Sequence, residues 1–291
     1  MFEGFVEKKV GTNGAAVNLV VGGNGPPLLL LHGYPQSHVM WHKVAPQLSQ
    51  HFTVVAADLR GYGDSDKPAG DPEHFNYSKR AMARDQVEAM ESLGFSTFYL
   101  AGHDRGARVS HRLTKDNPDR VLKLATLDII PTHRMFQIVN KEMAANTYHW
   151  FFLIQPYDFP ERVIGADADY FIRHSFQRGD NWREVFPEEA ISEYVRCSTD
   201  PATIHAICED YRAGASIDLV HDEEDFANKI TCPHLALWSD RGYVGRTQDV
   251  LGVWRDYSTN VSGHSMPSGH YIAEELPAET YTELRDFFLD P

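Results

Sequence analysis

The sequence predicts an α/β protein, in which a mostly parallel sheet carries helices on both faces and a helical cap interrupts the chain. Two observations predict it. Short apolar runs alternate with amphipathic stretches, an order typical of strand–helix–strand units. This alternation stops between about residues 131 and 228, where aromatic residues are frequent, and strand-like runs resume near Thr231.

Each predicted strand is short and apolar. The first covers residues 26–33, ends in glycine, and has the continuous apolar character of a strand buried on both faces. Residues 77–93 are predicted to form a helix, because apolar residues recur near helical spacing and Gly94 supplies a stop signal. We therefore expect a core made of residues 1–130 and 229–291, with the cap at 131–228. The remaining predicted strands cover residues 52–58, 97–102, 121–128 and 234–240.

Composition excludes several classes of protein. The 291 residues are 42% hydrophobic and 23% charged, as in an ordinary globular protein. With 27 Lys and Arg against 41 Asp and Glu, the net charge of −14 argues against nucleic-acid or anionic membrane partners. The three widely spaced cysteines give no disulfide framework or zinc pattern. Because no signal peptide and no apolar run of about 20 residues is found, we expect a cytoplasmic protein.

The most informative segment is Gly-His-Asp-Arg-Gly at 102–106, between a predicted strand and a predicted helix. The spacing Gly-x-nucleophile-x-Gly is typical of a nucleophile elbow, and Asp104 occupies its centre. A carboxylate is already ionised at neutral pH, and it can displace a leaving group from an sp³ carbon to give an ester. A simple helix-capping aspartate would not need the glycine pair. We therefore interpret Asp104 as a nucleophile.

A loop near the C-terminus supplies two candidate bases, His264 and His270. We favour His270, because it precedes the final helix and fits the order nucleophile, acid, histidine. Asp128 and Asp240 each end a predicted strand, and either could orient the histidine and stabilise its cation.

Backbone groups and two further motifs bear on the function. The N–H groups of Tyr34 and Arg105 could form an oxyanion hole for hydrolysis of the ester. The glycine-rich segment 58–65 is interpreted as structural. The spacing of His38 and His42 suits a zinc pair, but no third ligand is evident and no metal is expected.

Several segments together resemble the fluoroacetate (haloacetate) dehalogenases, which have the α/β-hydrolase fold. The resemblance extends over nearly the whole chain. It implies hydrolytic dehalogenation of a small anionic haloacid without a cofactor, in a protein that is a homodimer. It also implies that Asp128, rather than Asp240, completes the triad with Asp104 and His270. The resembling segments are 32–36, 102–108, 127–132, 148–155, 208–213 and 269–270.

Substrate and halide sites can also be assigned. Arg105 stands where related epoxide hydrolases and haloalkane dehalogenases typically carry tryptophan, and Arg108 lies one helical turn further. Both guanidinium groups could converge on a substrate carboxylate. The resemblance implies a halide site formed by His149, Trp150 and Tyr211, whose N–H and O–H groups are suitable donors.

Two other functions stay open at this stage. An epoxide hydrolase would share the aspartate and the histidine, although Arg105 would then have no clear task. A non-catalytic small-molecule receptor with the same fold is the second alternative, because a fold does not determine a function.

Overall fold

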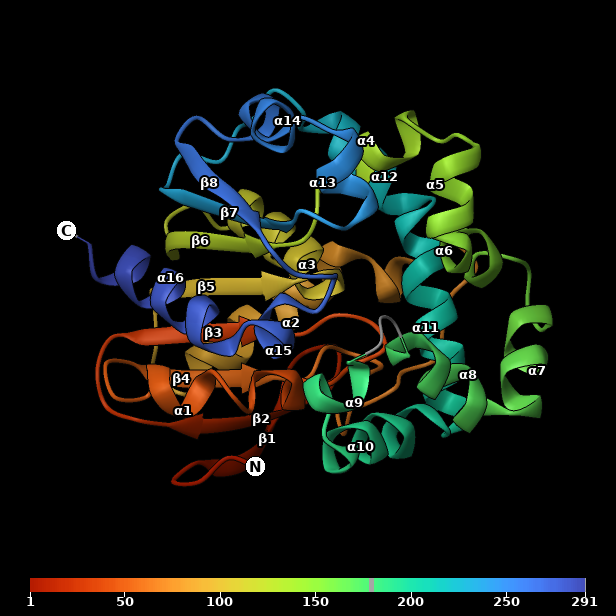
Figure 1. The fold of residues 1–291 in the computed structure, drawn as a ribbon, viewed down its shortest axis with the longest axis horizontal. Helices are drawn as coiled ribbons and strands as arrows, with labels where there is room; N and C mark the ends of the chain where they lie inside the picture. Colours follow the sequence, from red (N-terminus) through yellow and green to blue (C-terminus); the bar gives the residue numbers. More distant parts are fainter. Residues whose placement is uncertain (178–180, 291) are drawn as a thin grey trace.

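The computed structural model describes residues 1–177 and 181–290, which form a single eight-stranded sheet with helices around it (Figure 1). The strands are β1 (Val6–Gly11), β2 (Ala16–Gly22), β3 (Pro27–Leu31), β4 (Thr53–Ala57), β5 (Phe98–His103), β6 (Val121–Leu127), β7 (His234–Ser239) and β8 (Val261–Met266). Their order is β1-β2-β4-β3-β5-β6-β7-β8. Strand β2 pairs antiparallel with β1 and β4, and the other pairs are parallel. The predicted mostly parallel α/β architecture is confirmed.

All five predicted strands are present, with bounds that differ by no more than a few residues. Strands β1, β2 and β8 were not among the predictions. In β1 five of six residues are exposed and three are charged. Strand β8 reads Val-Ser-Gly-His-Ser-Met, so neither strand presents a continuous apolar run. Strand pairing, which a single sequence does not reveal, brings these segments into the sheet.

Two apolar layers pack on opposite faces of the sheet, as the alternating side chains of β3 show. Leu29 and Leu31 belong to one buried cluster, whereas Leu28 and Leu30 belong to the other. The first cluster includes apolar residues of α2 (Lys79–Ser92), α3 (Arg105–Asp116) and α14 (Val250–Tyr257). The second includes residues of α1 (Ala45–Leu48), α15 (Ile272–Glu275) and α16 (Pro277–Leu289). Burial on both faces explains why the central strands read as unbroken apolar runs.

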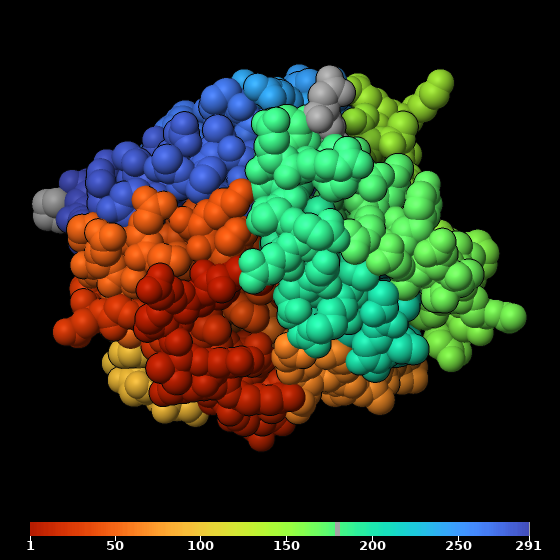
Figure 2. Space-filling model, turned by 60° about the horizontal axis from the view of Figure 1, so that its bottom comes forward, coloured from red at the N-terminus to blue at the C-terminus, as the bar shows by residue number. Residues whose placement is uncertain are grey.

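Between β6 and β7 the described residues contain helices and no strand. These helices lie beyond the carboxyl ends of the parallel strands (Figure 1), and in the space-filling view they form a lobe against the N-terminal part of the core (Figure 2). None of the described helices is both long and apolar enough to cross a bilayer. We call α5 to α11 the cap helices. In order, the helices are α4 (Thr132–Gln137), α5 (Lys141–Asn146), α6 (Tyr148–Leu153), α7 (Phe159–Ala166), α8 (Ala168–Phe176), α9 (Trp182–Val185), α10 (Glu188–Ser198), α11 (Pro201–Gly214) and α12 (Ile217–Glu224).

Candidate active site

Asp104 lies in a sharp turn between β5 and α3. Its backbone has φ 45° and ψ −115°, a conformation that costs about 1–3 kcal/mol for a residue other than glycine. The glycines on either side permit the close packing around this turn. A Cβ on Gly102 would lie 2.5 Å from Ser110 Oγ, and one on Gly106 would lie 2.3 Å from His32 O. The turn thus has the close-packed geometry that the glycine spacing predicts.

The loop after β8 brings His270 to the end of β6. His270 Nδ1 lies 2.6 Å from Asp128 Oδ2, while Asp128 Oδ1 accepts a hydrogen bond of 2.8 Å from Ser239 N. The two alternative residues lie elsewhere: the side chain of His264 is 52% exposed and that of Asp240 is 47% exposed. Of the four candidates, the structure therefore pairs His270 with Asp128.

The Asp104 carboxylate is buried and held as an anion. Burial alone would raise its pKa, but the charges of His270, Arg108 and Arg105 outweigh burial and lower the pKa to about 2. Asp104 Oδ2 accepts a hydrogen bond of 3.1 Å from Tyr34 N. One predicted oxyanion-hole N–H therefore already points at the carboxylate, and the N–H of Arg105 follows at the start of α3.

A cavity of about 340 Å³ opens over Asp104. The core contributes the carboxylate, the histidine–aspartate pair and two arginines to its wall. The cap contributes aromatic side chains, so the cavity lies where the cap helices meet the sheet edge. Its lining includes Tyr34, Asp104, Arg108, Asp128, Tyr148, His149, Trp150, His174, Arg241 and His270.

The two arginines differ in what they offer to a ligand. Arg108 lines the cavity, donates from Nη1 to Ile130 O and Thr132 Oγ1 at 3.0 Å each, and has a buried Nε without a partner among the described residues. Burial lowers its pKa to about 10, so it remains a cation at neutral pH. Arg105 instead donates from Nε and Nη2 to Asp210 at 2.8 Å. In the described part of the chain only its Nη1 makes no hydrogen bond.

The three predicted halide ligands lie close together on cap helices α6 and α11. The ring of Tyr211 is 5.9 Å from that of His149 and 6.1 Å from that of Trp150. Tyr211 Oη is buried with no hydrogen-bond partner among the described residues, and burial raises its pKa well above the usual value. A buried donor without a partner is costly, which is consistent with a role in binding a ligand.

Asp210 and His103 contact the candidate residues without having been singled out in the sequence. Asp210 neutralises Arg105, and His103 Nε2 lies 2.7 Å from His270 O. Both contacts join segments far apart in the chain. The only sequence signal is position, because Asp210 precedes Tyr211 and His103 precedes Asp104.

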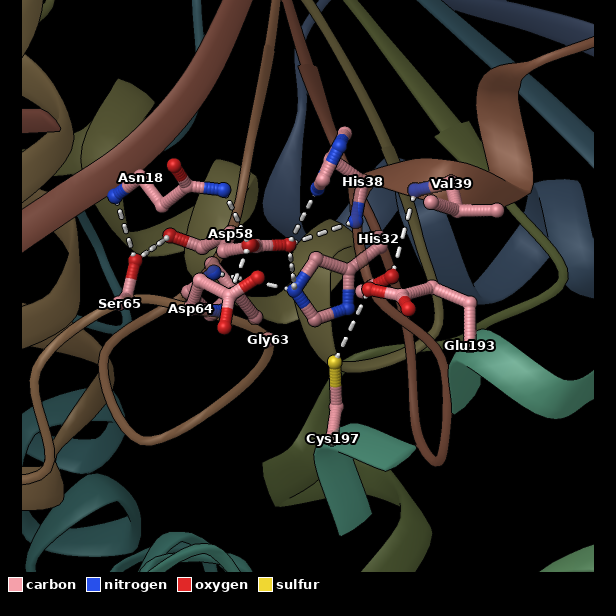
Figure 3. A network of polar contacts seen from close by, with 12 residues as sticks. Asn18, His32, His38, Val39, Asp58, Gly63, Asp64, Ser65, Glu193 and Cys197 are labelled. Atoms are coloured by element: carbon pink, nitrogen blue, oxygen red, sulfur yellow. Dashed lines mark hydrogen bonds and ion pairs between the residues drawn. The ribbon is translucent and has the colours of Figure 1, made fainter. Parts of the chain in front are cut away.

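The glycine-rich exit from β4 forms a separate polar network (Figure 3). Asp58 Oδ1 accepts from His38 N at 2.7 Å and contacts His38 Nδ1 at 2.9 Å. Asp58 Oδ2 accepts from Asn18 Nδ2 at 3.0 Å and from Asp64 N at 3.1 Å. These contacts satisfy the carboxylate internally, which agrees with a structural interpretation of residues 58–65.

One cluster near this network has the residue types of a metal site. Asp64, Glu193 and Cys197 place candidate ligand atoms within 4.8 Å of one another (Figure 3). Arg196 Nη2 donates to both Asp64 Oδ2 and Glu193 Oε1 at 2.6 Å. A side-chain cation therefore already occupies the position between the two carboxylates.

Comparison with known proteins identifies the family. Residues 26–269 match the family profile of the alpha/beta hydrolase fold. The chain is 47% identical over 291 residues to a fluoroacetate dehalogenase of Burkholderia sp., covering 100% of this chain and 96% of that protein. It is 35% identical to a soluble epoxide hydrolase of Corynebacterium sp. (strain C12), covering 95% and 94% of the two chains. A solved α/β hydrolase structure from Nostoc sp. PCC 7120 superposes with a TM-score of 0.98 at 54% identity, over 100% of both chains.

Proposed function

Because the chain belongs to the fluoroacetate dehalogenase family of the α/β-hydrolase fold, a family of hydrolases, we propose that it hydrolyses short 2-haloacids through an ester on Asp104. The products would be the halide and a 2-hydroxy acid, which is glycolate when the substrate is a haloacetate. The convergence of Asp104, the His270–Asp128 pair and Arg108 on one cavity carries this proposal.

Substrate binding would begin with the carboxylate. Arg108 lines the cavity and has an unused Nε, so it is the main proposed partner. Arg105 contributes positive charge and its Nη1, since Asp210 already holds its other nitrogens. A charge-assisted hydrogen bond to a carboxylate is about twice as strong as a neutral one. This local cationic site would select an anion although the protein as a whole has a net charge of −14.

In the first chemical step, a carboxylate oxygen of Asp104 attacks the carbon that carries the halogen. The new C–O bond forms as the carbon–halogen bond breaks, and the bonding electrons leave with the halide. His149, Trp150 and Tyr211 would donate hydrogen bonds to the departing anion. Fluoride in particular requires such donors, because it is a poor leaving group and its charge develops in the transition state.

In the second step, His270 takes a proton from water, and the resulting hydroxide attacks the carbonyl carbon of the Asp104 ester. The N–H groups of Tyr34 and Arg105 would stabilise the oxyanion, while Asp128 would stabilise the histidine cation. The ester C–O bond then breaks. The alkoxide of the product takes the proton from His270, which leaves Asp104 as a carboxylic acid. This acid loses its proton, the second one of the water molecule, to solvent, and the Asp104 carboxylate is restored.

Halide release tests this proposal. Fluoroacetate and chloroacetate are supplied in parallel to wild-type enzyme and to Asp104→Asn, and free fluoride and chloride are measured. We expect release of both halides by the wild type and of neither by the variant. Release of chloride alone would agree with the aspartate mechanism. It would contradict the proposal that His149, Trp150 and Tyr211 stabilise a departing fluoride. Release of neither halide by the wild type would refute the proposed function.

Epoxide hydrolysis is the second candidate, favoured by the 35% identity to a soluble epoxide hydrolase. The buried hydroxyl of Tyr211 could protonate an epoxide oxygen, but Arg108 would then have no substrate carboxylate to bind. Turnover of a neutral epoxide such as styrene oxide, with no halide release from either haloacetate, would favour this alternative.

A further inference from the structure

The imidazole of His103 connects the strand that carries the nucleophile to the loop that carries the base. His103 is the last residue of β5, directly before Asp104. Its Nε2 lies 2.7 Å from the carbonyl oxygen of His270, and the two rings have centroids 4.6 Å apart. One side chain therefore links the turn that carries Asp104 to the loop that carries His270. Hydrolysis of the ester depends on how these two segments are placed relative to each other.

The direction of this hydrogen bond follows from its surroundings. The His103 side chain is fully buried, and burial lowers its pKa to about 4, so the ring is neutral at neutral pH. A carbonyl oxygen can only accept, and Nδ1 has no hydrogen-bond partner among the described residues. The ring proton is therefore on Nε2, which donates to His270 O.

The side chain of Glu275 also holds this loop. Glu275 accepts from Gly269 N at 2.6 Å and from Tyr271 N at 3.0 Å. The N–H groups on both sides of His270 are thus anchored by Glu275, whereas the His270 carbonyl is anchored by His103. Among these contacts, only that of His103 connects the loop to the nucleophile turn.

We propose that His103 is a positioning residue, which sets the placement of His270 for hydrolysis of the Asp104 ester by holding the His270 carbonyl. This inference rests on the proposed function. Formation of the ester needs only the carboxylate of Asp104 and the bound haloacid. Hydrolysis of the ester also needs the imidazole of His270 within reach of a water molecule, and a misplacement of about 1 Å can cost about 100-fold in rate.

The test compares two substitutions that differ in reach. In His103→Gln the amide nitrogen can replace Nε2, whereas the shorter side chain of His103→Asn cannot reach the carbonyl. His234→Asn is the matched control, because His234 is also buried in the sheet, on β7, with Nε2 at 2.9 Å from Thr126 Oγ1. Rapid-quench chloride release from chloroacetate measures ester formation, and intact-protein mass spectrometry measures the ester.

We expect ester hydrolysis to slow by about 10- to 100-fold in His103→Asn, while ester formation changes by less than about threefold. The ester should therefore accumulate in His103→Asn after a burst of chloride. His103→Gln should restore most of the hydrolysis rate, and the His234→Asn control should accumulate no ester. If His103→Asn does not fold, His103→Phe provides the same comparison, because it keeps a ring but has no donor.

A folded His103→Asn or His103→Phe variant that hydrolyses the ester at the wild-type rate would overturn the inference. So would a variant in which ester formation, rather than hydrolysis, becomes the slow step. His270→Asn, measured in parallel, tests formation of the Asp104 ester independently of His103. If wild type releases no chloride, or if His270→Asn forms no ester, the proposed function fails and the positioning role fails with it.

Discussion

Replacement of Asp210 by asparagine tests how the cap is fixed over the site. The carboxylate of Asp210, on cap helix α11, accepts from Arg105 Nε and Nη2 at 2.8 Å and from Tyr62 Oη at 2.6 Å, and it also pairs with Lys79. The side chains of Asp210 and Arg105 are 0% and 1% exposed. In Asp210→Asn, Lys79 would still have an ion pair with Asp218, whose Oδ2 lies 3.2 Å from Lys79 Nζ. Arg105 would lose the carboxylate that compensates its charge. Leaving one charge of a buried pair uncompensated costs about 3–5 kcal/mol, and we expect Asp210→Asn to lose that much stability.

Urea unfolding, followed by tryptophan fluorescence at neutral pH, measures this loss. Asp169→Asn is the control, since Asp169 and Arg173 form a solvent-exposed pair at 3.0 Å and such pairs contribute about 1 kcal/mol or less. Arg105 and Lys79 hold the pKa of Asp210 below its usual range against the opposing effect of burial. The contribution of the carboxylate is therefore complete above about pH 4 and is lost as the pH falls further. A loss below about 1 kcal/mol for Asp210→Asn at neutral pH would show that the Asp210 carboxylate does not compensate the buried charge of Arg105.

Three further predictions concern a buried carboxyl group, a pair of glycines and the proposed carboxylate-binding arginine. Burial raises the pKa of Glu274 to about 8, so its contribution to stability is complete below about pH 4 and declines by about 1.4 kcal/mol per unit as the pH rises toward 8. In urea titrations at several pH values, Glu274→Gln should make the free energy of unfolding less dependent on pH. An unchanged pH dependence would contradict the raised pKa of Glu274. The Cβ of Gly106→Ala would lie 2.3 Å from a backbone oxygen, so this variant should lose about 1–3 kcal/mol of stability or more. Gly165 has open space around it, so Gly165→Ala should be neutral or slightly stabilising. Thermal melts measure both effects. Arg108→Gln should raise KM for chloroacetate by about 10- to 100-fold, as loss of a hydrogen bond to a charged group implies, and an unchanged KM would exclude carboxylate binding by Arg108.

The central strands and the nucleophile turn could be predicted because their signals are local. Strand β3 needs apolar side chains on both faces, and the turn at Asp104 needs glycine where a Cβ would collide with neighbouring atoms. Both requirements appear as runs or spacings of a few residues. Strand β8 gave no such signal, because it is partly polar and is held in the sheet by pairing with β7.

The supporting contacts of the site could not be predicted for a related reason. Asp210 and Arg105 are separated by 105 positions, and His103 and His270 by 167. Neither spacing has a periodicity that a single sequence displays. Strand position alone does not decide between Asp128 and Asp240 either, since both follow strands. The family resemblance favours Asp128, and the folded chain shows that its carboxylate lies next to His270.

The mass of the enzyme during turnover tests the covalent mechanism most directly. His270→Asn removes the proposed base but leaves Asp104 and both arginines in place. Incubated with chloroacetate, this variant should gain the mass of one carboxymethyl group, and peptide mapping should locate the group on Asp104, whereas the double variant with Asp104→Asn should gain nothing. A folded His270→Asn variant that releases chloride but carries no added mass would contradict an ester intermediate on Asp104.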